Sequence, residues 1–283
     1  MKAARSILEN RASVSSRDED AFFAKLRLPN GTFKTTGAGR LAALDQWLAT
    51  QLGSRDVRLL DVAVSSGVTT VDLIDALTAH GINATVTACD LCISAYIRSL
   101  APGIEALFDA NGHVLQLSTP VLVKGRPHDP RGSFARSALA ASFRVLERLN
   151  GLGQPRRRSG DRPVQLISRR LQEQGDVEVV EHDLFALRAE WAGRFDIIRA
   201  ANILNRDYFD NAQLTDVLRS LSAYLAPGGM LLVARTDETS VTTATLFRRD
   251  ADGRFALVDR YGGGSYIEHL VLAAHDGARA GVA

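Results

Sequence analysis

Small and acidic side chains follow an apolar segment near residue 60 in a spacing that suits ligand binding. The segment ends at Asp61 and leads into a loop that carries Ala63, Ser65 and Gly67 before a helix-like pattern begins. Because these side chains are small, the backbone of the loop can approach a bound ligand closely. A strand, a small-residue loop and a helix in this order are typical of the nucleotide side of a doubly wound sheet. We therefore expect the chemistry of the chain to begin here.

Further apolar segments follow in an order that the same kind of sheet requires. Residues 84–91 end in Asp90, whose ionised carboxylate accepts two hydrogen bonds and suits the two hydroxyls of a ribose. Residues 177–185 end in His-Asp-Leu, and residues 194–209 join an apolar strand to a polar loop. A helix predicted over 207–225 is ended by Pro-Gly-Gly before a fifth strand. Strands that alternate with helices predict a parallel sheet.

The loop after the first strand separates two classes of cofactor. The dinucleotide fingerprint G-x-G-x-x-G is absent, which opposes an NAD-dependent oxidoreductase. The loop resembles instead the first motif of class I S-adenosylmethionine (SAM) dependent methyltransferases, acid-x-Gly-x-Gly-x-Gly. Ala63 and Ser65 replace the first two glycines of that motif, and Gly67 retains the third. The resemblance covers residues 57–235 apart from a long insertion, and it implies a Rossmann-like fold that binds SAM.

Within this class, the chain is similar to the chemotaxis receptor glutamate methyltransferases. The similarity rests on the loop at 63–67 and on residues 195–209. The acidic residues that follow the loop in those enzymes are replaced here by Val68, Thr69 and Thr70. Methylation of receptors is therefore not implied.

The resemblance implies a role for residues at the end of each strand. Asp90 would hold the ribose, Asp183 would accept from the adenine amino group, and Leu184 or Phe185 would pack on the ring. The full set implied for the cofactor is Asp61, Ala63, Ser65, Gly67, Asp90, Leu91, Asp183, Leu184, Ala201 and Asn202.

The candidate catalytic residues lie in the polar loop after the fourth strand and are Asn202, Asn205, Asp207 and Tyr208. SAM carries an electrophilic methyl group, and its transfer needs a nucleophile aligned behind the methyl carbon. An amine or hydroxyl must also lose a proton, which these residues would assist, whereas a carboxylate needs no base. Asn202 cannot act as a base and would orient a ligand, and Asp207 has an alternative role as a helix cap.

Three functions are compatible with these patterns. The leading hypothesis is a SAM-dependent methyltransferase that acts on an oxygen or nitrogen of a small molecule. A second is a protein carboxyl methyltransferase. The third is an inactive SAM-binding or scaffolding protein, because two motif glycines are replaced.

Length and composition predict one large α/β domain with additions. The chain has 283 residues, 46% of them hydrophobic, and a formal charge of +2, which opposes a dedicated nucleic-acid surface. We expect a doubly wound, Rossmann-like, mostly parallel sheet with an antiparallel C-terminal hairpin and an α+β insertion. The expected parts are a helical lid segment at 1–56, a methyltransferase domain at 57–275 with its insertion at 101–175, and a frayed tail at 276–283.

The segments outside the motifs carry weaker patterns. In the lid segment, Thr35, Thr36 and Arg40 either approach the methionine carboxylate of SAM or lie in a flexible surface loop. In the insertion, an Asn-Gly turn between alternating apolar residues predicts a hairpin near 104–117. Residues 244–272 are expected to form three strands, separated by an Asp-Gly turn and a run of glycines.

The end of the insertion is basic and amphipathic. Residues 133–158 form either a helix packed on the core with a solvated basic face or a peripheral contact with an anionic membrane. Cys89 and Cys92 make a Cys-x-x-Cys motif, but no further ligands lie near them in the sequence, so no metal site is expected. Because the sequence shows no run of roughly 20 apolar residues and no signal-peptide pattern, we expect a cytoplasmic protein.

Overall fold

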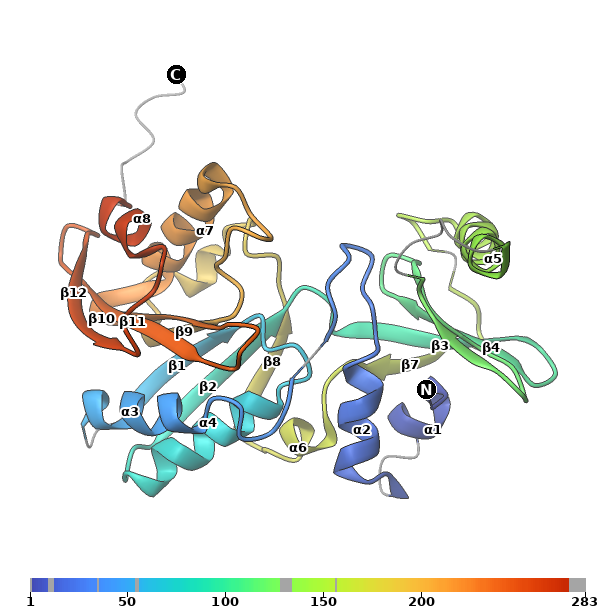
Figure 1. Cartoon of the computed structure of the whole chain (residues 1–283), viewed down its shortest axis with the longest axis horizontal. Helices are drawn as coiled ribbons and strands as arrows, with labels where there is room; N and C mark the ends of the chain where they lie inside the picture. Colours follow the sequence, from blue (N-terminus) through green and yellow to red (C-terminus); the bar gives the residue numbers. More distant parts are fainter. Residues whose placement is uncertain are drawn as a thin grey trace. The chain divides into compact units, whose positions relative to one another are not determined.

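The computed structural model describes residues 2–9, 13–34, 36–53, 56–127, 134–155 and 157–274, so Thr35 and the predicted tail at 276–283 lie outside the described residues. The chain forms two compact units. Unit 1 comprises Met1–Gly37, Ser65–Val68 and Cys92–Glu173, and unit 2 comprises Ala38–Val64, Thr69–Leu91 and Gln174–Ala283. Each unit contains its own sheet, and the chain can be followed through both in Figure 1.

A seven-stranded sheet forms the centre of unit 2, in the order β12-β11-β10-β9-β1-β2-β8. Its strands are β1 (Val57–Val62), β2 (Ala84–Asp90), β8 (Val177–Glu181), β9 (Phe195–Ala201), β10 (Leu225–Thr236), β11 (Thr242–Arg249) and β12 (Phe255–Tyr261). Pairing is parallel from β8 to β10 and antiparallel from β10 to β12. This confirms the predicted α/β class, with a mostly parallel sheet and an antiparallel C-terminal hairpin.

Helices cover both faces of this sheet because its inner strands are apolar on both sides. Leu59 packs in the cluster formed with α3 (Ala42–Leu52) and α4 (Val68–Ala79). The next residue, Leu60, packs in the cluster formed with α7 (Asn211–Tyr224) and α8 (Glu268–Ala273). Successive side chains of a strand point to opposite faces, so one apolar strand contributes to two cores. A short 3-10 helix, Ala189–Trp191, adds the buried Trp191 to the second cluster.

Unit 1 contains a five-stranded antiparallel sheet in the order β6-β5-β4-β3-β7. Its strands are β3 (Ser94–Ala101), β4 (Ile104–Asp109), β5 (Val114–Ser118), β6 (Val123–Gly125) and β7 (Arg162–Gln165). The helices of this unit are α1 (Ala4–Leu8), α2 (Ser16–Phe23), α5 (Phe134–Asn150) and α6 (Arg169–Gln172). Helices α1 and α2 pack on the face that carries Ile97 and Leu107, whereas α5 packs on the face that carries Tyr96 and Phe108.

Several elements differ from the sequence prediction. Helix α7 begins at Asn211 rather than at Asp207, because the capping box is formed by Asp210 and Gln213. The third C-terminal strand is instead helix α8, since Ile267 and Val271 follow a helical spacing and are both buried. The hairpin of β4 and β5 was predicted, whereas strands β3 and β7 were not, so the second sheet begins at Ser94, before residue 101.

Candidate functional site

The predicted site residues of unit 2 gather at the carboxyl edge of its sheet. Val62 pairs with both Cys89 and Ala200, and Asp90 pairs with Glu181. Because these parallel strands are in register, the residues that follow β1, β2, β8 and β9 leave the sheet at the same edge. The chain runs outward from β1 to β2 and β8, then resumes on the other side at β9, so the strand order reverses at β1. Ligands of open α/β sheets bind at such a switch point.

Asp61 lies at this edge but is fully engaged with protein groups. Its carboxylate accepts from Arg199 Nε at 2.9 Å and Arg199 Nη2 at 2.6 Å, and from the Thr70 hydroxyl at 2.7 Å. Arg199 also donates to Asp45 Oδ1 at 2.9 Å and to the carbonyl of Thr69 at 3.0 Å. The guanidinium therefore joins β1, β9, α3 and the first turn of α4, and Asp61 serves as its main acceptor.

The third member of this cluster, Asp45, is less well balanced. Its Oδ2 has no hydrogen-bond partner among the described residues, and the residue is completely buried. Burial raises the pKa of Asp45 to about 6, although the attraction of Arg199 opposes this. Arg199 was not among the residues predicted from the sequence. The available signal was an arginine inside the apolar run of β9, because a charge buried in a strand requires a partner.

The small-residue loop has a backbone that usually requires glycine, although two of its three positions with positive φ carry other residues. Ala63, Ser65 and Gly67 all lie in the left-handed region, with φ of 56°, 61° and 79°. Residues other than glycine rarely adopt this conformation, which costs about 1–2 kcal/mol each. Ala63 and Ser65 thus have backbone conformations that usually require glycine.

In unit 1, the lid segment holds Ser65 and Ser66 of this loop. The buried Lys34 donates from Nζ to the carbonyl of Ser65 at 2.9 Å. The Thr36 hydroxyl lies 2.8 Å from that of Ser66 and 3.2 Å from that of Ser65. From the sequence, Thr36 was expected either to approach the methionine carboxylate of SAM or to lie in a flexible surface loop, and Lys34 was not predicted to take part. A lysine between an aromatic residue and two threonines gave no signal that it would be buried.

The acids after β2 and β8 differ in exposure. Asp90 is 8% exposed, and its carbonyl accepts from the amide of His182 at 3.0 Å. Asp183 is exposed, and its carboxylate accepts from the amide of Phe185 at 3.0 Å. Leu184 packs in the apolar cluster of α7, whereas Leu91 is half exposed. Exposed apolar surface next to the two acids is thus supplied by Leu91 and Phe185.

The loop after β9 uses most of its polar atoms to hold its own shape. Ala201 is the last residue of β9, and Asn202, at φ 62°, accepts from the amide of Thr236 through Oδ1 at 2.7 Å. Asn205 donates to the carbonyl of Asn202 at 3.3 Å and accepts from the amide of Asp207 at 2.9 Å.

Two further candidates of the same loop lie at the surface. The carboxylate of Asp207 pairs with Arg235 at 2.6 Å while remaining 69% exposed, and it does not cap α7. Tyr208 is half exposed and contacts Phe209 edge to face, with ring centroids 6.3 Å apart.

The histidine after β8 and the two cysteines around Asp90 are buried. Burial lowers the pKa of His182, which packs on Trp191 and lies 3.2 Å from the Tyr224 hydroxyl. Burial likewise raises the pKa of the Cys89 thiol. Neither Cys89 nor Cys92 forms a disulfide bond. Within the described ranges, no cluster of three or more His, Cys, Asp or Glu residues suits a metal ion, and no helix there is long and apolar enough to span a bilayer.

Comparison with known proteins gives distant structural likenesses only. No family model and no curated protein matches the chain. Among solved structures, the PH0226 protein from Pyrococcus horikoshii OT3 matches 82% of this chain and 78% of its own, at 14% identity and a TM-score of 0.37. The N-methyltransferase NodS from Bradyrhizobium japonicum WM9, solved with S-adenosyl-L-homocysteine, matches 70% of this chain at 15% identity and a TM-score of 0.34. The CurJ carbon methyltransferase matches 72% at 15% identity and the same TM-score.

The chain spans 62% of the length of NodS and 38% of that of CurJ. A likeness of this degree assigns neither a reaction nor a substrate to the chain.

Proposed function

We propose that the chain is a SAM-dependent methyltransferase. The observation that carries the proposal is the form of the loop after β1, where Ala63, Ser65 and Gly67 all take the left-handed backbone of a glycine loop. This loop leaves the sheet at its switch point, where α/β proteins bind nucleotide-type ligands. Strained backbone at residues other than glycine clusters at ligand-binding sites, which supports a ligand at this loop.

The donors and acceptors at this edge fit the nucleoside part of SAM. Asp90 ends β2, and an ionised carboxylate accepts hydrogen bonds only, which matches the two hydroxyls of a ribose. Asp183 follows β8 and offers an exposed carboxylate to an adenine amino group, with Phe185 available to pack on the ring. Asp61 does not fit a direct contact, because Arg199 and Thr70 already occupy its oxygens. Asp61 instead holds Arg199, which donates to the carbonyl of Thr69 just after the loop.

SAM, when bound, supplies a methyl carbon activated by the adjacent sulfonium. The residues of the chain then have to hold the nucleoside, orient the acceptor and exclude water. Asn202 and Asn205 cannot remove a proton, and Asp207 is paired with Arg235. Among the described residues of this loop, Tyr208 is the remaining candidate base, and an exposed phenol is a weak one. We therefore expect an acceptor atom on a small molecule that is already nucleophilic when it binds.

The same observation favours a second candidate, transfer to a carboxylate. A carboxylate acceptor is deprotonated at neutral pH and needs no general base. A carboxylate acceptor therefore suits the loop after β9, whose polar atoms hold the loop itself. The acceptor carboxylate can belong to a small molecule or to a protein. We propose the cytoplasm as the place of action in either case.

The test is calorimetric titration with SAM and S-adenosyl-L-homocysteine. We expect the wild type to bind both, and Asp90→Ala to bind at least about tenfold more weakly because two hydrogen bonds are lost. Asp216→Ala on the exposed side of α7 is the control and should bind like the wild type. Absence of binding by the wild type would refute the proposal. Binding without methyl transfer to amines, hydroxyls or carboxylates would indicate an inactive SAM-binding protein.

A further inference from the structure

Helix α5 of unit 1 presents a face to solvent that the proposed function does not use. This outer face consists of Ala138, Ala141, Arg144, Val145, Arg148 and Leu149, all exposed. Val145 is 53% exposed and Leu149 is 71% exposed, and Leu152, in the turn after the helix, is 48% exposed. The apolar members recur at spacings of three and four residues, so they form one stripe along the helix. Large aliphatic side chains with this exposure mark a contact surface when they are grouped.

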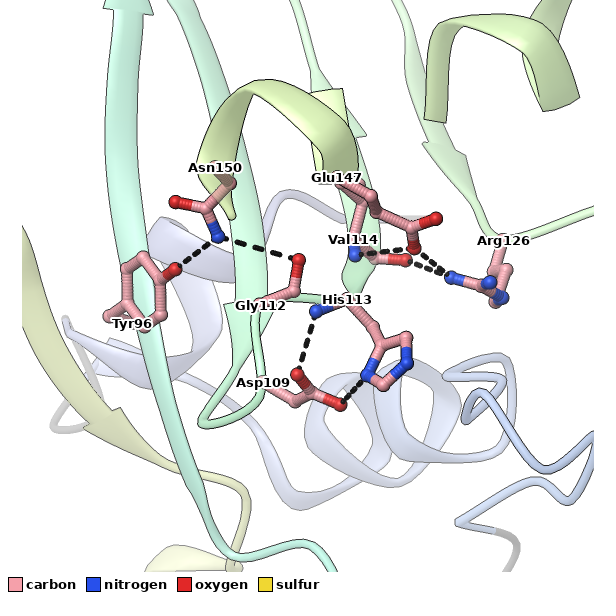
Figure 2. A network of polar contacts seen from close by, with 8 residues as sticks. All are labelled: Tyr96, Asp109, Gly112, His113, Val114, Arg126, Glu147 and Asn150. Atoms are coloured by element: carbon pink, nitrogen blue, oxygen red, sulfur yellow. Dashed lines mark hydrogen bonds and ion pairs between the residues drawn. The ribbon is translucent and has the colours of Figure 1, made fainter. Parts of the chain in front are cut away.

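The orientation of α5 is fixed by polar contacts on its opposite side, which Figure 2 shows. Glu147 accepts from the amide of Val114 at 3.0 Å and pairs with Arg126 at 2.6 Å. Asn150 donates to the Tyr96 hydroxyl at 2.6 Å. Both side chains come from α5 and point at the sheet. The outer face is therefore held outward and does not become buried by a rotation of the helix.

The charge of this face is positive and uncompensated. Arg144 and Arg148 form no ion pair among the described residues, and they lie one turn apart along one side of the apolar stripe. The acids nearest in sequence, Glu147 and Asp161, are buried and paired with Arg126 and Arg98. The outer face thus offers two cations and several aliphatic side chains but no exposed carboxylate.

We propose that the outer face of α5 binds the surface of an anionic lipid membrane. An interfacial helix needs aliphatic side chains that enter the acyl boundary and arginines that meet the headgroups, and this face supplies both. A second copy of the chain would bring like charges together, because Arg144 and Arg148 would meet their equivalents. Nucleic acid would account for the arginines but not for the exposed Val145 and Leu149. A partner helix requires a groove, whereas among the described residues α5 is the single helix packed on this face of the sheet.

The first experiment is sedimentation of the full chain with vesicles at about 0.1 M salt. One set is pure phosphatidylcholine, and the other contains phosphatidylglycerol at about one third. We expect the wild type to sediment with the anionic vesicles, to remain free with the neutral ones, and to be released at high salt, because screening weakens surface charges. Binding that is equal for both sets would overturn the proposal, as would no binding to the anionic set.

The variants test the two parts of the face separately. Val145→Asp with Leu149→Asp removes the aliphatic contact, and Arg144→Gln with Arg148→Gln removes the charge. Each double variant should lose vesicle affinity by about tenfold or more. The matched controls are Leu187→Asp with Val241→Asp, and Arg219→Gln with Arg254→Gln, which change exposed residues of unit 2 and should bind like the wild type. Thermal unfolding of every variant verifies that the substitutions leave the fold intact.

The variants also distinguish the other occupants of this face. If the chain does not bind vesicles but its sedimentation mass rises with protein concentration, and Val145→Asp with Leu149→Asp abolishes this rise, the face binds a second copy. Binding to duplex DNA that the arginine variant abolishes, without vesicle binding, would assign it to nucleic acid. Either result would refute the lipid surface, and neither depends on methyl transfer.

Discussion

At the scale of single residues, the main feature is the buried cluster of Asp45, Arg199 and Asp61. Two carboxylates share one guanidinium in a site with no access to water. The desolvation of three charges is compensated only when the hydrogen bonds are complete, and one oxygen of Asp45 has no partner among the described residues. Asp45 is therefore the member whose charge costs the most.

This imbalance predicts how Asp45→Asn changes stability with pH. Burial raises the pKa of Asp45 to about 6, above its value near 3.9 in an unfolded chain. The folded protein therefore binds the proton of Asp45 more tightly than the unfolded chain does. The stability that this proton contributes is fully present below about pH 4 and is lost as the pH rises through about 6. An asparagine does not titrate. The variant should therefore be more stable than the wild type at pH 7, by about 1–3 kcal/mol.

Urea unfolding between pH 4 and 8 measures the difference between the variant and the wild type. This difference should grow from pH 4 to pH 6 and then remain constant. Asp75→Asn on the exposed side of α4 is the control and should show no such trend. A difference for Asp45→Asn that is independent of pH would contradict the assignment of the pKa shift to this residue.

Gly67 is the glycine in the loop after β1. Gly67 has a φ of 79°, and a Cβ placed on it would overlap the side chain of Leu171. Gly67→Ala should therefore lower the free energy of unfolding by about 1–3 kcal/mol through backbone strain and overlap. Gly37→Ala is the matched control, because nothing lies within 4 Å of its added Cβ, and it should change stability by less than about 0.5 kcal/mol. Equal effects of the two substitutions in thermal unfolding would refute this account.

Among the helices and strands, the start of α7 shows which of two acidic residues caps this helix. Asp207 was predicted as an alternative helix cap. Instead, Asp210 accepts from the amide of Gln213, and the Gln213 side chain accepts from the amide of Asp210. Asp210→Ala removes this capping box and should cost about 1 kcal/mol. Asp207→Ala removes only an exposed ion pair and should cost less than about 0.5 kcal/mol. Chemical denaturation of both variants decides between them, and the reverse order would show that the cap is misplaced.

The strands of unit 2 could be predicted because each is a continuous apolar run ended by polar or small residues, as in β1 and β2. Helix α8 was predicted as a strand because residues 267–272 are rich in β-branched and aliphatic side chains. The helix has only six residues, so its pattern of apolar residues is too short to identify it. Burial of Ile267 and Val271 in the cluster that contains α7 favours the helix over a strand. The pair of Asp61 and Arg199 was beyond the reach of the sequence, since it depends on the register that places β1 beside β9.

At the scale of the whole molecule, the chain enters and leaves unit 1 repeatedly. Met1–Gly37, Ser65–Val68 and Cys92–Glu173 are separated in sequence but cluster together. From the sequence, the first segment was predicted as part of a lid and residues 101–175 as an insertion, without a link between them. That link is a shared core, in which Phe22 and Phe23 of α2 pack with Ile97 of β3 and Leu107 of β4. Local patterns do not reveal it, because contacts between distant segments depend on the complete fold.

The shared core predicts which fragment of the chain can fold. In a fragment of residues 92–173, one face of the second sheet would lose α1 and α2 and expose apolar side chains such as Ile97 and Leu107, which are each 1% exposed in the whole chain. An antiparallel sheet with one uncovered apolar face is prone to aggregation. We expect this fragment to show no cooperative thermal transition by circular dichroism. Joining residues 1–37 to it through a glycine and serine linker should restore one, because the face is covered again. A cooperative transition in the fragment alone would show that α5 and the sheet suffice for folding.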